Sequence, residues 1–247
     1  MTTPLFTIIT CTYNAESTLE RTIRSVDSQT YPGIEHLILD GKSTDRTLEI
    51  AARSERARII SEPDKGLYDA MNKGISLATG DYLIFLNAGD CFHSKEALSQ
   101  VASMLEGNRP DVIYGETALV DENGEFLRMR RLQAPENLNW KSFKDGMLVC
   151  HQAFWARTEI ARKTQYDLQY RFSADVDWCI RIMKGSNTLF NTRTTLIDYL
   201  SEGMSTANRK ASLKERFRIM QHHYGLPSTV ARHLWFVIRA FLKKGAI

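Results

Sequence analysis

Four short polar segments stand where chemistry is expected, because each directly follows an apolar run. They are Thr12–Asn14, Asp40-Gly41, Glu62–Asp64 and Asn87–Asp90. Three of them contain carboxylates, and Thr12–Asn14 offers a hydroxyl, a phenol and an amide. Carboxylate oxygens accept hydrogen bonds from ligand N–H and O–H groups and coordinate divalent cations. The chain is therefore expected to carry a polar, partly anionic site.

The last of these segments is the candidate for metal binding. It follows Tyr82–Leu86, a fully apolar predicted strand. A carboxylate at the end of a buried strand is costly without a partner, and a divalent cation bridging to a diphosphate is a natural one. Asp90, with Asn87 nearby, would hold it. Asn, Gly and Asp also form turns, so an ordinary turn is the alternative.

A second group of candidates lies in the other half of the chain. Asp175 and Asp177, two acids with Trp178 beside them at the start of a predicted helix over residues 173–183, suit a general base that faces an acceptor hydroxyl. Capping of that helix by an acid is the alternative, and a histidine in this region can also be structural. The acceptor-side candidates are His151, Gln152, Asp177 and Trp178.

Two nucleotide-binding motifs are excluded. Gly41–Thr44 resembles the end of a Walker A loop, but the glycine that the loop requires five positions earlier is His36. No GxGxxG follows the first predicted strand, which excludes a dinucleotide dehydrogenase. Thr10–Asn14 also lacks the glycine-rich, cationic phosphate loop of a nucleotidyltransferase. The arginines 128, 130 and 131 could meet phosphates or form a solvated face.

The elements that position these residues alternate in residues 1–115. Strands are predicted over 6–10, 36–40, 58–61, 82–86 and 111–114, and helices over 15–30, 43–53, 67–78 and 96–105. This order predicts an α/β fold with a mostly parallel, doubly wound sheet. In such sheets ligands bind beyond the carboxyl ends of the strands, where the four polar segments stand.

The pattern changes after residue 115. Asn123-Gly124 predicts a β-hairpin over 118–131. It is followed by an irregular stretch at 132–150, a strand at 151–156, the helix at 173–183, a β-rich stretch at 188–200 and helices at 207–224 and 229–244. We expect residues 1–115 to form a nucleotide-sugar half, 116–206 an acceptor half of mixed α and β structure, and 207–247 basic amphipathic C-terminal helices.

Composition and charge narrow the class of protein. The chain has 247 residues, enough for one large domain, and a net charge of +3, too small to suggest binding to nucleic acid. Residues 207–247 carry nine Lys/Arg and one acid, whereas residues 1–206 carry 23 basic and 28 acidic residues. Four cysteines without a CxxC pair, no secretory signal and no long apolar run indicate a cytoplasmic protein.

The last predicted helix, over 229–244, is amphipathic. At 100° per residue its apolar side chains fall in an arc of about 160°, with cations opposite. Such a helix suits the cytoplasmic face of the inner membrane, close to a lipid-linked acceptor. Packing on the domain, or on a second subunit in a homo-oligomer, is the alternative. The arc contains Val230, Ala231, Leu234, Trp235, Val237, Ile238, Phe241 and Leu242, opposite Arg232, Arg239 and Lys243.

Five segments in this order resemble family 2 glycosyltransferases with the GT-A fold, over roughly residues 5 to 205. The opening segment is Ile8–Asn14, followed by Leu39–Asp45 and then by Glu62–Gly66 together with Asn72–Gly74. Tyr82–Asp90 stands where that family has its metal-binding DxD element. Ala174-Asp175 stands where a Glu-Asp pair carries the catalytic base.

The resemblance implies transfer of a sugar from a nucleotide donor, with uridine favoured, to an acceptor hydroxyl with inversion. The acceptor would be a saccharide or a lipid-linked molecule in surface polysaccharide or glycolipid assembly. Asp175 would be the base, and Mn²⁺ or Mg²⁺ would bind Asp90 with Asn87. Asp40 would accept from the nucleobase N–H, Tyr13 would stack on its ring, and Asp64 and Asn72 would lie near the ribose. The nucleotide-binding residues would be Thr12, Tyr13, Asn14, Asp40, Asp64, Asn72 and Lys73.

The sequence departs from this family's pattern at three points. Gly41 replaces the second acid after strand two, an amide and a glycine (Asn87 and Gly89) replace the acids of the DxD element, and Ala174 replaces the glutamate of the Glu-Asp pair. A non-catalytic module that binds a nucleotide sugar is therefore the alternative function.

Overall fold

The computed structural model describes residues 3–201 and 209–244. Within these ranges one sheet of nine strands has the order β3-β2-β1-β4-β8-β6-β9-β5, with β7 paired to β6. The strands are β1 (Phe6–Thr12), β2 (Ile34–Asp40), β3 (Ala57–Ser61), β4 (Tyr82–Phe85), β5 (Cys91–Phe92), β6 (Val112–Val120), β7 (Phe126–Met129), β8 (Phe154–Arg157) and β9 (Leu189–Leu200).

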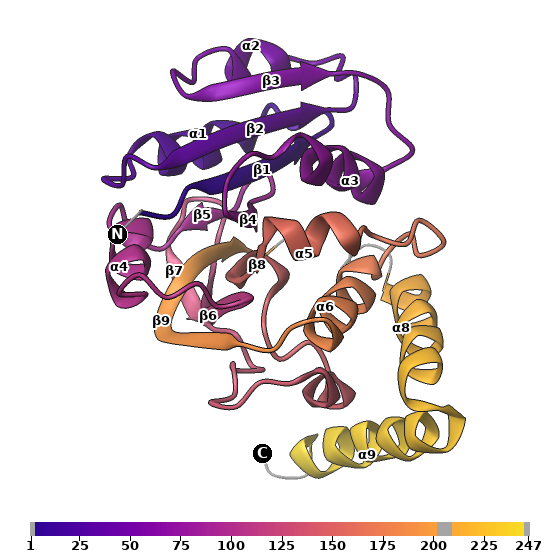
Figure 1. The fold of residues 1–247 in the computed structure, drawn as a ribbon. Coiled ribbons are helices and arrows are strands. Elements are labelled where there is room, and N and C mark those ends of the chain that lie inside the picture. The colour runs from indigo at the N-terminus through magenta and orange to yellow at the C-terminus, as the bar shows by residue number, and fades with distance from the viewer. Residues whose placement is uncertain (1–2, 202–208, 245–247) are drawn as a thin grey trace.

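Helices lie along this sheet and beside its second half (Figure 1). The α-helices are α1 (Leu19–Asp27), α2 (Thr47–Ala51), α3 (Leu67–Leu77), α4 (Ala97–Met104), α5 (Thr158–Lys163), α6 (Ala174–Lys184), α8 (Arg209–Tyr224) and α9 (Leu226–Lys244). Two 3₁₀ helices, η1 (Trp140–Asp145) and η2 (His151–Ala153), lie between β7 and β8.

The N-terminal half is the predicted parallel sheet. Strands β3, β2, β1 and β4 are all parallel, with Thr12 paired to Asp40 and Asp40 paired to Ser61 at their carboxyl ends. Every residue of β1 and β4 is buried, because helices or other core residues cover both faces. The α/β fold is thereby confirmed. Helix α1 begins at Leu19 rather than at residue 15, since residues 15–18 form a turn.

The second half has mixed strand directions. Strand β8 is antiparallel to β4 and β6, whereas β9 is parallel to β6. The predicted hairpin is confirmed, with Ala118 paired to Met129. The strand predicted over 151–156 begins only at Phe154, because residues 151–153 turn as η2. The sequence did not predict α5, β5 or η1.

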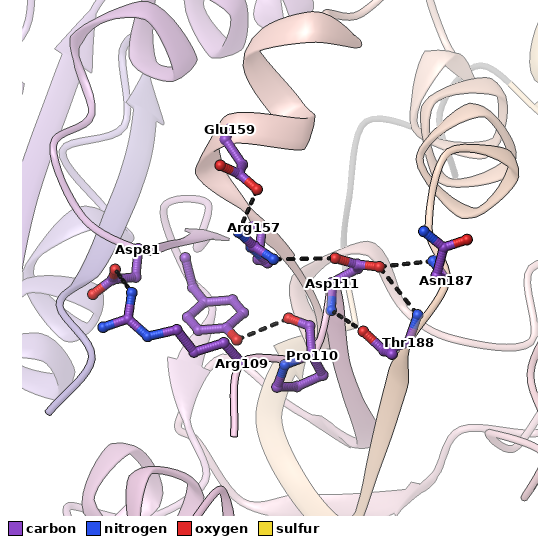
Figure 2. Close-up of polar contacts among 9 residues, drawn as sticks. Asp81, Arg109, Pro110, Asp111, Arg157, Glu159, Asn187 and Thr188 are labelled. Atoms are coloured by element: carbon purple, nitrogen blue, oxygen red, sulfur yellow. Dashed lines mark hydrogen bonds and ion pairs between the residues drawn. The ribbon is translucent and has the colours of Figure 1, made fainter. Parts of the chain in front are cut away.

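A polar network fixes the junction between the halves, on the edge opposite the carboxyl ends of β1–β4 (Figure 2). Asp111 accepts the backbone N–H groups of Asn187 (2.7 Å) and Thr188 (3.1 Å) and pairs with Arg157 (3.4 Å). The start of β6 is therefore tied to the end of β8 and to the start of β9. Arg109 pairs with Asp81 at 3.0 Å beside it.

The C-terminal helices pack on the acceptor half. Helix α8 contacts α6, and α9 contacts η1 (Figure 1). The expected boundary between residues 206 and 207 lies outside the described residues. In the described part of the chain, no helix combines the length and the apolar character that crossing a bilayer requires.

Candidate active site

Asp40 lies at the carboxyl end of β2, but its carboxylate is already occupied. It is 2% exposed and accepts the hydroxyls of Thr12 (3.3 Å), Ser61 (2.7 Å) and Ser43, together with the Ser43 N–H (3.1 Å). These bonds join the ends of three strands and shape the loop after β2. Asp40 and Thr12 are thus bonded to each other and to the surrounding loops, and their expected roles in nucleotide binding stay predictions.

Gly41 opens a space that another carboxylate fills. A Cβ on Gly41 would lie 2.6 Å from Asp64 Oδ2 and 3.5 Å from Tyr13 Cδ2. The glycine therefore lets Asp64 and the Tyr13 ring approach each other across the loop. Tyr13 is 67% exposed, which leaves its ring free to stack on a planar ligand. Asn14 lies beside it with φ 48°, and its side-chain oxygen accepts the Thr44 N–H at 2.9 Å.

A small pocket adjoins this loop and is lined by charged groups. Lys73 closes it, since its ammonium pairs with Glu62 at 2.9 Å and donates to the Pro63 carbonyl at 2.7 Å. The side chain of Asn72 exchanges hydrogen bonds with the backbone of Tyr166 at 3.0 and 2.7 Å. Asn72 thus joins α3 to the acceptor half, and its expected place near the ribose stays a prediction.

Asp90 is buried and held by two N–H donors. Gln152 donates to Oδ2 at 2.8 Å, and the Leu200 backbone donates to Oδ1 at 3.0 Å. Burial raises the pKa of Asp90 to about 7, although both donors favour the ionised form. Asp90 therefore pins the loop after β4 to β9 and to η2. Gln152, expected on the acceptor side, performs this positioning task instead.

The residues of this loop do not fit a cation held by carboxylates. In residues 3–201 and 209–244, no group of three or more His, Cys, Asp or Glu side chains could hold a metal ion. Asp90 directs both oxygens at protein donors, and its exposed fraction is 4%. Asn87 Oδ1 is the one buried side-chain oxygen of this segment without a hydrogen-bond partner among the described residues. A single amide oxygen is a weak ligand for Mn²⁺ or Mg²⁺.

Asp175 differs from the other acids of the site. It stands in the first turn of α6 and is partly exposed, and the Tyr68 hydroxyl donates to its Oδ1 at 3.3 Å. Tyr68 belongs to the first turn of α3, directly after the loop that carries Asp64. The pair therefore connects the nucleotide half with the acceptor half. A carboxylate in the first turn of a helix is stabilised by the helix dipole.

The segment that leads into α6 is fixed from the C-terminal helices. The Glu215 carboxylate of α8 accepts the N–H groups of Arg171, Phe172 and Ser173 at 2.9, 2.7 and 3.0 Å. The Ser173 hydroxyl also bonds that of Ser212 at 2.9 Å. Helix α8 thus holds the residues directly before Ala174 and Asp175.

His151 and Trp178 belong to an aromatic core beneath Asp175. His151 stacks on Phe85 and bonds the Tyr166 hydroxyl, and burial lowers its pKa to about 4. Trp178 is 0% exposed and stacks on Tyr166 with ring centroids 5.0 Å apart. Neither ring can touch an acceptor, so their acceptor-side roles are corrected. They belong to the packed interior next to Asp175.

Asp177 points to the opposite side of α6 from Asp175. It pairs with Arg181 at 2.6 Å and with His223 of α8 at 2.7 Å, and it is 2% exposed. Burial alone would raise the pKa of Asp177, but the bonds from His223 and Arg181 outweigh it and lower the pKa. Lys184 can only donate to His223 Nδ1, so Nε2 carries the proton given to Asp177. Asp177 therefore holds α8 against α6. It was expected to contact the acceptor, and the structure places it in this packing contact instead.

The three hairpin arginines separate in the structure. Arg128 and Arg131 are exposed, whereas Arg130 folds inward and donates to the carbonyls of Met147 (2.7 Å) and Leu148 (3.4 Å). Arg130 is thus the member of this cluster that folds toward the protein interior.

Sequence reasoning did not single out Tyr68, Tyr166 or His223 for the site. Tyr68 follows the Glu62–Gly66 loop directly, and that position was the available signal. Tyr166 and His223 come from segments without a motif, and only tertiary packing brings them to α3 and α6. No local pattern could have revealed them.

The parallel strands, the polar loops at their carboxyl ends and the partly exposed acid on α6 form an α/β architecture of the GT-A class. The sequence model of the family described as "Glycosyl transferase family 2" matches residues 7–164 of this chain. The chain belongs to this family and is a glycosyltransferase.

Curated relatives and solved structures agree with this assignment. A "PGL/p-HBAD biosynthesis glycosyltransferase" of Mycobacterium bovis is 36% identical over 203 residues, covering 78% of this chain and 74% of the relative. The "Amylovoran biosynthesis glycosyltransferase AmsB" of Erwinia amylovora is 30% identical over 196 residues, covering 72% and 64%.

Among solved structures, residues 1–349 of S. aureus TarS in complex with UDP-GlcNAc have a TM-score of 0.73 at 17% identity, over 88% of this chain and 64% of that solved chain. This chain therefore spans less than two thirds of the solved TarS segment. The mannosyltransferase PcManGT of Pyrobaculum calidifontis, in complex with GDP-Man and Mn²⁺, has a TM-score of 0.63 at 16% identity, over 100% and 80%. At such identities these structures support the fold alone.

Proposed function

We propose that this glycosyltransferase moves a sugar from a UDP-linked donor to an acceptor hydroxyl with inversion, and that Asp175 is the general base. The observation that carries the proposal is the contrast among the acids. Asp40, Asp90 and Asp177 are each at most 4% exposed and are held by several donors, whereas Asp175 is partly exposed beside one tyrosine. It is the acid best placed to receive a proton from a ligand.

The nucleoside would bind over the loop after β2. The exposed Tyr13 ring offers a stacking surface, and Asp64 offers a carboxylate oxygen beside Gly41. A nucleobase N–H is a donor that such an oxygen accepts. Asp64 thus takes the role first expected of Asp40. Uridine is favoured by the resemblance in the sequence and by the UDP-GlcNAc bound to TarS.

The reaction is a single displacement. The acceptor oxygen forms a bond to the anomeric carbon as the bond to the diphosphate oxygen breaks, and the hydroxyl proton passes to Asp175. A base acts in this way when it lies within about 2.6–3.2 Å of the hydroxyl, directly or through one water. The Tyr68 hydroxyl fixes one oxygen of Asp175 and leaves the other for the acceptor.

The leaving diphosphate needs positive charge. The proposed reaction uses no divalent cation. The segment from Asn87 to Asp90 does not fit a cation held by carboxylates, because both Asp90 oxygens already accept from protein N–H groups. We assign the task of offsetting the charge of the diphosphate to Arg130, the hairpin arginine that folds inward and donates to the carbonyls of Met147 and Leu148. Titration of UDP in Mn²⁺ and in EDTA tests this assignment. We expect the same affinity in both, and a requirement for Mn²⁺ would refute it.

The names of the curated relatives support one class of acceptor. Two of them are named for the biosynthesis of PGL/p-HBAD and of amylovoran. A saccharide or lipid-linked acceptor in glycolipid or surface polysaccharide assembly is therefore the substrate that we propose. The cytoplasm, where nucleotide sugars are made, is the corresponding location.

The substitution Asp175→Asn tests the proposal. It preserves shape and removes the basic oxygen, so we expect turnover to fall about 10²–10⁴-fold while UDP affinity stays unchanged. Asp167→Asn makes the same change outside the site and should retain full turnover, since the Asp167 carboxylate accepts only from nearby Gln169 among the described residues. Full activity of Asp175→Asn would refute the assignment of the base. UDP-sugar binding without any turnover of the wild type would identify a non-catalytic binding module instead.

A further inference from the structure

Helix α9 turns its polar side toward the body of the protein. Thr229 is buried, Arg232 pairs with Asp145 of η1 at 2.7 Å, and the His233 ring contacts Phe217 of α8 with centroids 4.9 Å apart. Ordinary packing of an amphipathic helix places the apolar side against the protein. The orientation of α9 is the reverse.

The apolar side of α9 is consequently exposed. Leu226, Val230, Leu234 and Ile238 follow one another at four-residue spacing and are 50%, 41%, 60% and 50% exposed. Trp235 beside them is 47% exposed. We call these five residues the α9 face. The side chains of Val237 and of residues 239–244, which the sequence placed on this helix, lie outside the described residues.

A row of cations lies on the neighbouring helix. Lys210, Lys214 and Arg218 are exposed at four-residue spacing on α8, and no ion pair is found for them among the described residues. Helix α8 runs down one side of the molecule and α9 crosses its lower end, remote from β1–β3 (Figure 1). Residues 207–247 carry nine Lys/Arg and one acid, whereas residues 1–206 have an excess of acids. The positive charge is thus concentrated in the segment that carries the exposed apolar face.

We propose that the α9 face docks on the surface of an anionic lipid bilayer, with the α8 cations against the lipid headgroups. Apolar side chains including a tryptophan, accompanied by cations without acidic partners, complement a surface that is apolar beneath and negative above. A second copy of this chain is a poorer occupant, because two such segments would bring their positive charges together. No part of the docking depends on catalysis.

Docking would also orient the acceptor site. Helix α9 contacts η1, and α8 contacts α6, the helix that carries Asp175. A bilayer beneath α8 and α9 would therefore lie on the acceptor half and leave the nucleotide half toward the solvent. This orientation, which rests on the proposed function, delivers a lipid-linked acceptor hydroxyl to Asp175 from the membrane side.

Sedimentation with vesicles tests the docking. We would compare vesicles of phosphatidylcholine with vesicles in which about a third of the lipid is phosphatidylglycerol, at low and high salt. The full chain should pellet with the anionic vesicles at low salt and be largely released by high salt. Equal binding to both kinds of vesicle, or no binding, would overturn the proposal.

Variants separate the two contributions. Leu234→Glu with Ile238→Glu should weaken partitioning about tenfold or more, because two buried contacts become charges. Lys210→Glu with Lys214→Glu should weaken binding to anionic vesicles alone. Leu168→Glu changes an exposed leucine (48%) away from α9 and should bind as the wild type does. Unchanged binding of the Leu234/Ile238 variant would overturn the role of the α9 face.

Two further readouts keep the outcomes distinct. A dimer in light scattering that the Leu234/Ile238 variant abolishes, without binding to vesicles, would identify a second copy as the occupant and overturn the proposal. Transfer to a soluble acceptor by that variant should equal the wild type. Loss of vesicle binding with intact transfer thus concerns the docking alone, whereas absent transfer in the wild type concerns the proposed function alone.

Discussion

Asp177 offers the sharpest test of the distinction between a packing acid and a substrate-binding acid. The substitution Asp177→Asn keeps the size of the side chain and removes its charge. In the structure this carboxylate receives Arg181 at 2.6 Å and His223 at 2.7 Å, and its side chain is 3% exposed. Loss of the charge weakens both bonds and leaves the amide N–H₂ group facing a donor.

The expected loss of stability in Asp177→Asn follows from the burial of this carboxylate and its two partners. A hydrogen bond to a charged group contributes about 1.5–3 kcal/mol, and breaking a buried pair costs about 3–5 kcal/mol. We therefore expect Asp177→Asn to lower the free energy of unfolding by about 3 kcal/mol. The lowered pKa of Asp177 fixes the pH range. The carboxylate stabilises the fold fully above its ordinary pKa, and this contribution is lost as the pH falls through the lower value of the folded state.

Urea unfolding of both proteins at neutral pH measures this difference. Asp145→Asn is the matched control, because Asp145 pairs with Arg232 on the surface, where both side chains are more than 40% exposed. Such a pair contributes less than about 1 kcal/mol. An Asp177→Asn protein with wild-type stability and greatly reduced transfer would refute the packing role and restore Asp177 to the acceptor site.

Two further predictions concern buried positions of the nucleotide half. Burial lowers the pKa of His36 from 6.5 to about 4, so the unfolded chain binds more protons between these values and stability rises with pH there. Wild type should lose about 3 kcal/mol more than His36→Gln on going from pH 7 to pH 4, as measured by urea unfolding, and parallel losses would contradict the assignment. At Gly74 a Cβ would lie 2.7 Å from Ile9 Cγ2, so Gly74→Ala should destabilise by about 1–3 kcal/mol in thermal unfolding. Gly185→Ala, with no atom nearer than 3.6 Å, should not, and equal effects of the two changes would argue against overpacking.

Much of the fold was predictable because its signals are local. Strand-forming runs such as Tyr82–Phe85 are buried on both faces and contain no polar residue, and Asn123-Gly124 allows the tight turn of the β6–β7 hairpin. Helix α3 was predicted over residues 67–78 and runs from Leu67 to Leu77. Gly66 is its N-cap and Ala78 is its C-cap. Residues 132–150 carried no periodicity, so η1 was not foreseen.

The candidate site was predictable only in part, because a residue type does not reveal which partners it finds. Asp40 and Asp90 stand after strands as expected, yet other side chains and backbone N–H groups from distant segments occupy their oxygens. Asp177 and Asp175 are two residues apart on one helix and face opposite sides, so one meets α8 and the other meets Tyr68. Spacing along the chain could not assign those partners.

The single acid of the C-terminal segment has a consequence for variation at the end of the chain. Glu215 accepts three successive N–H groups, and the last of them belongs to Ser173, two residues before Asp175. A premature stop or a frameshift between residues 201 and 215 would leave every strand of the sheet encoded but would release residues 171–173, the segment that leads into α6. Sequence changes that look like the trimming of a dispensable tail would then act as active-site mutations.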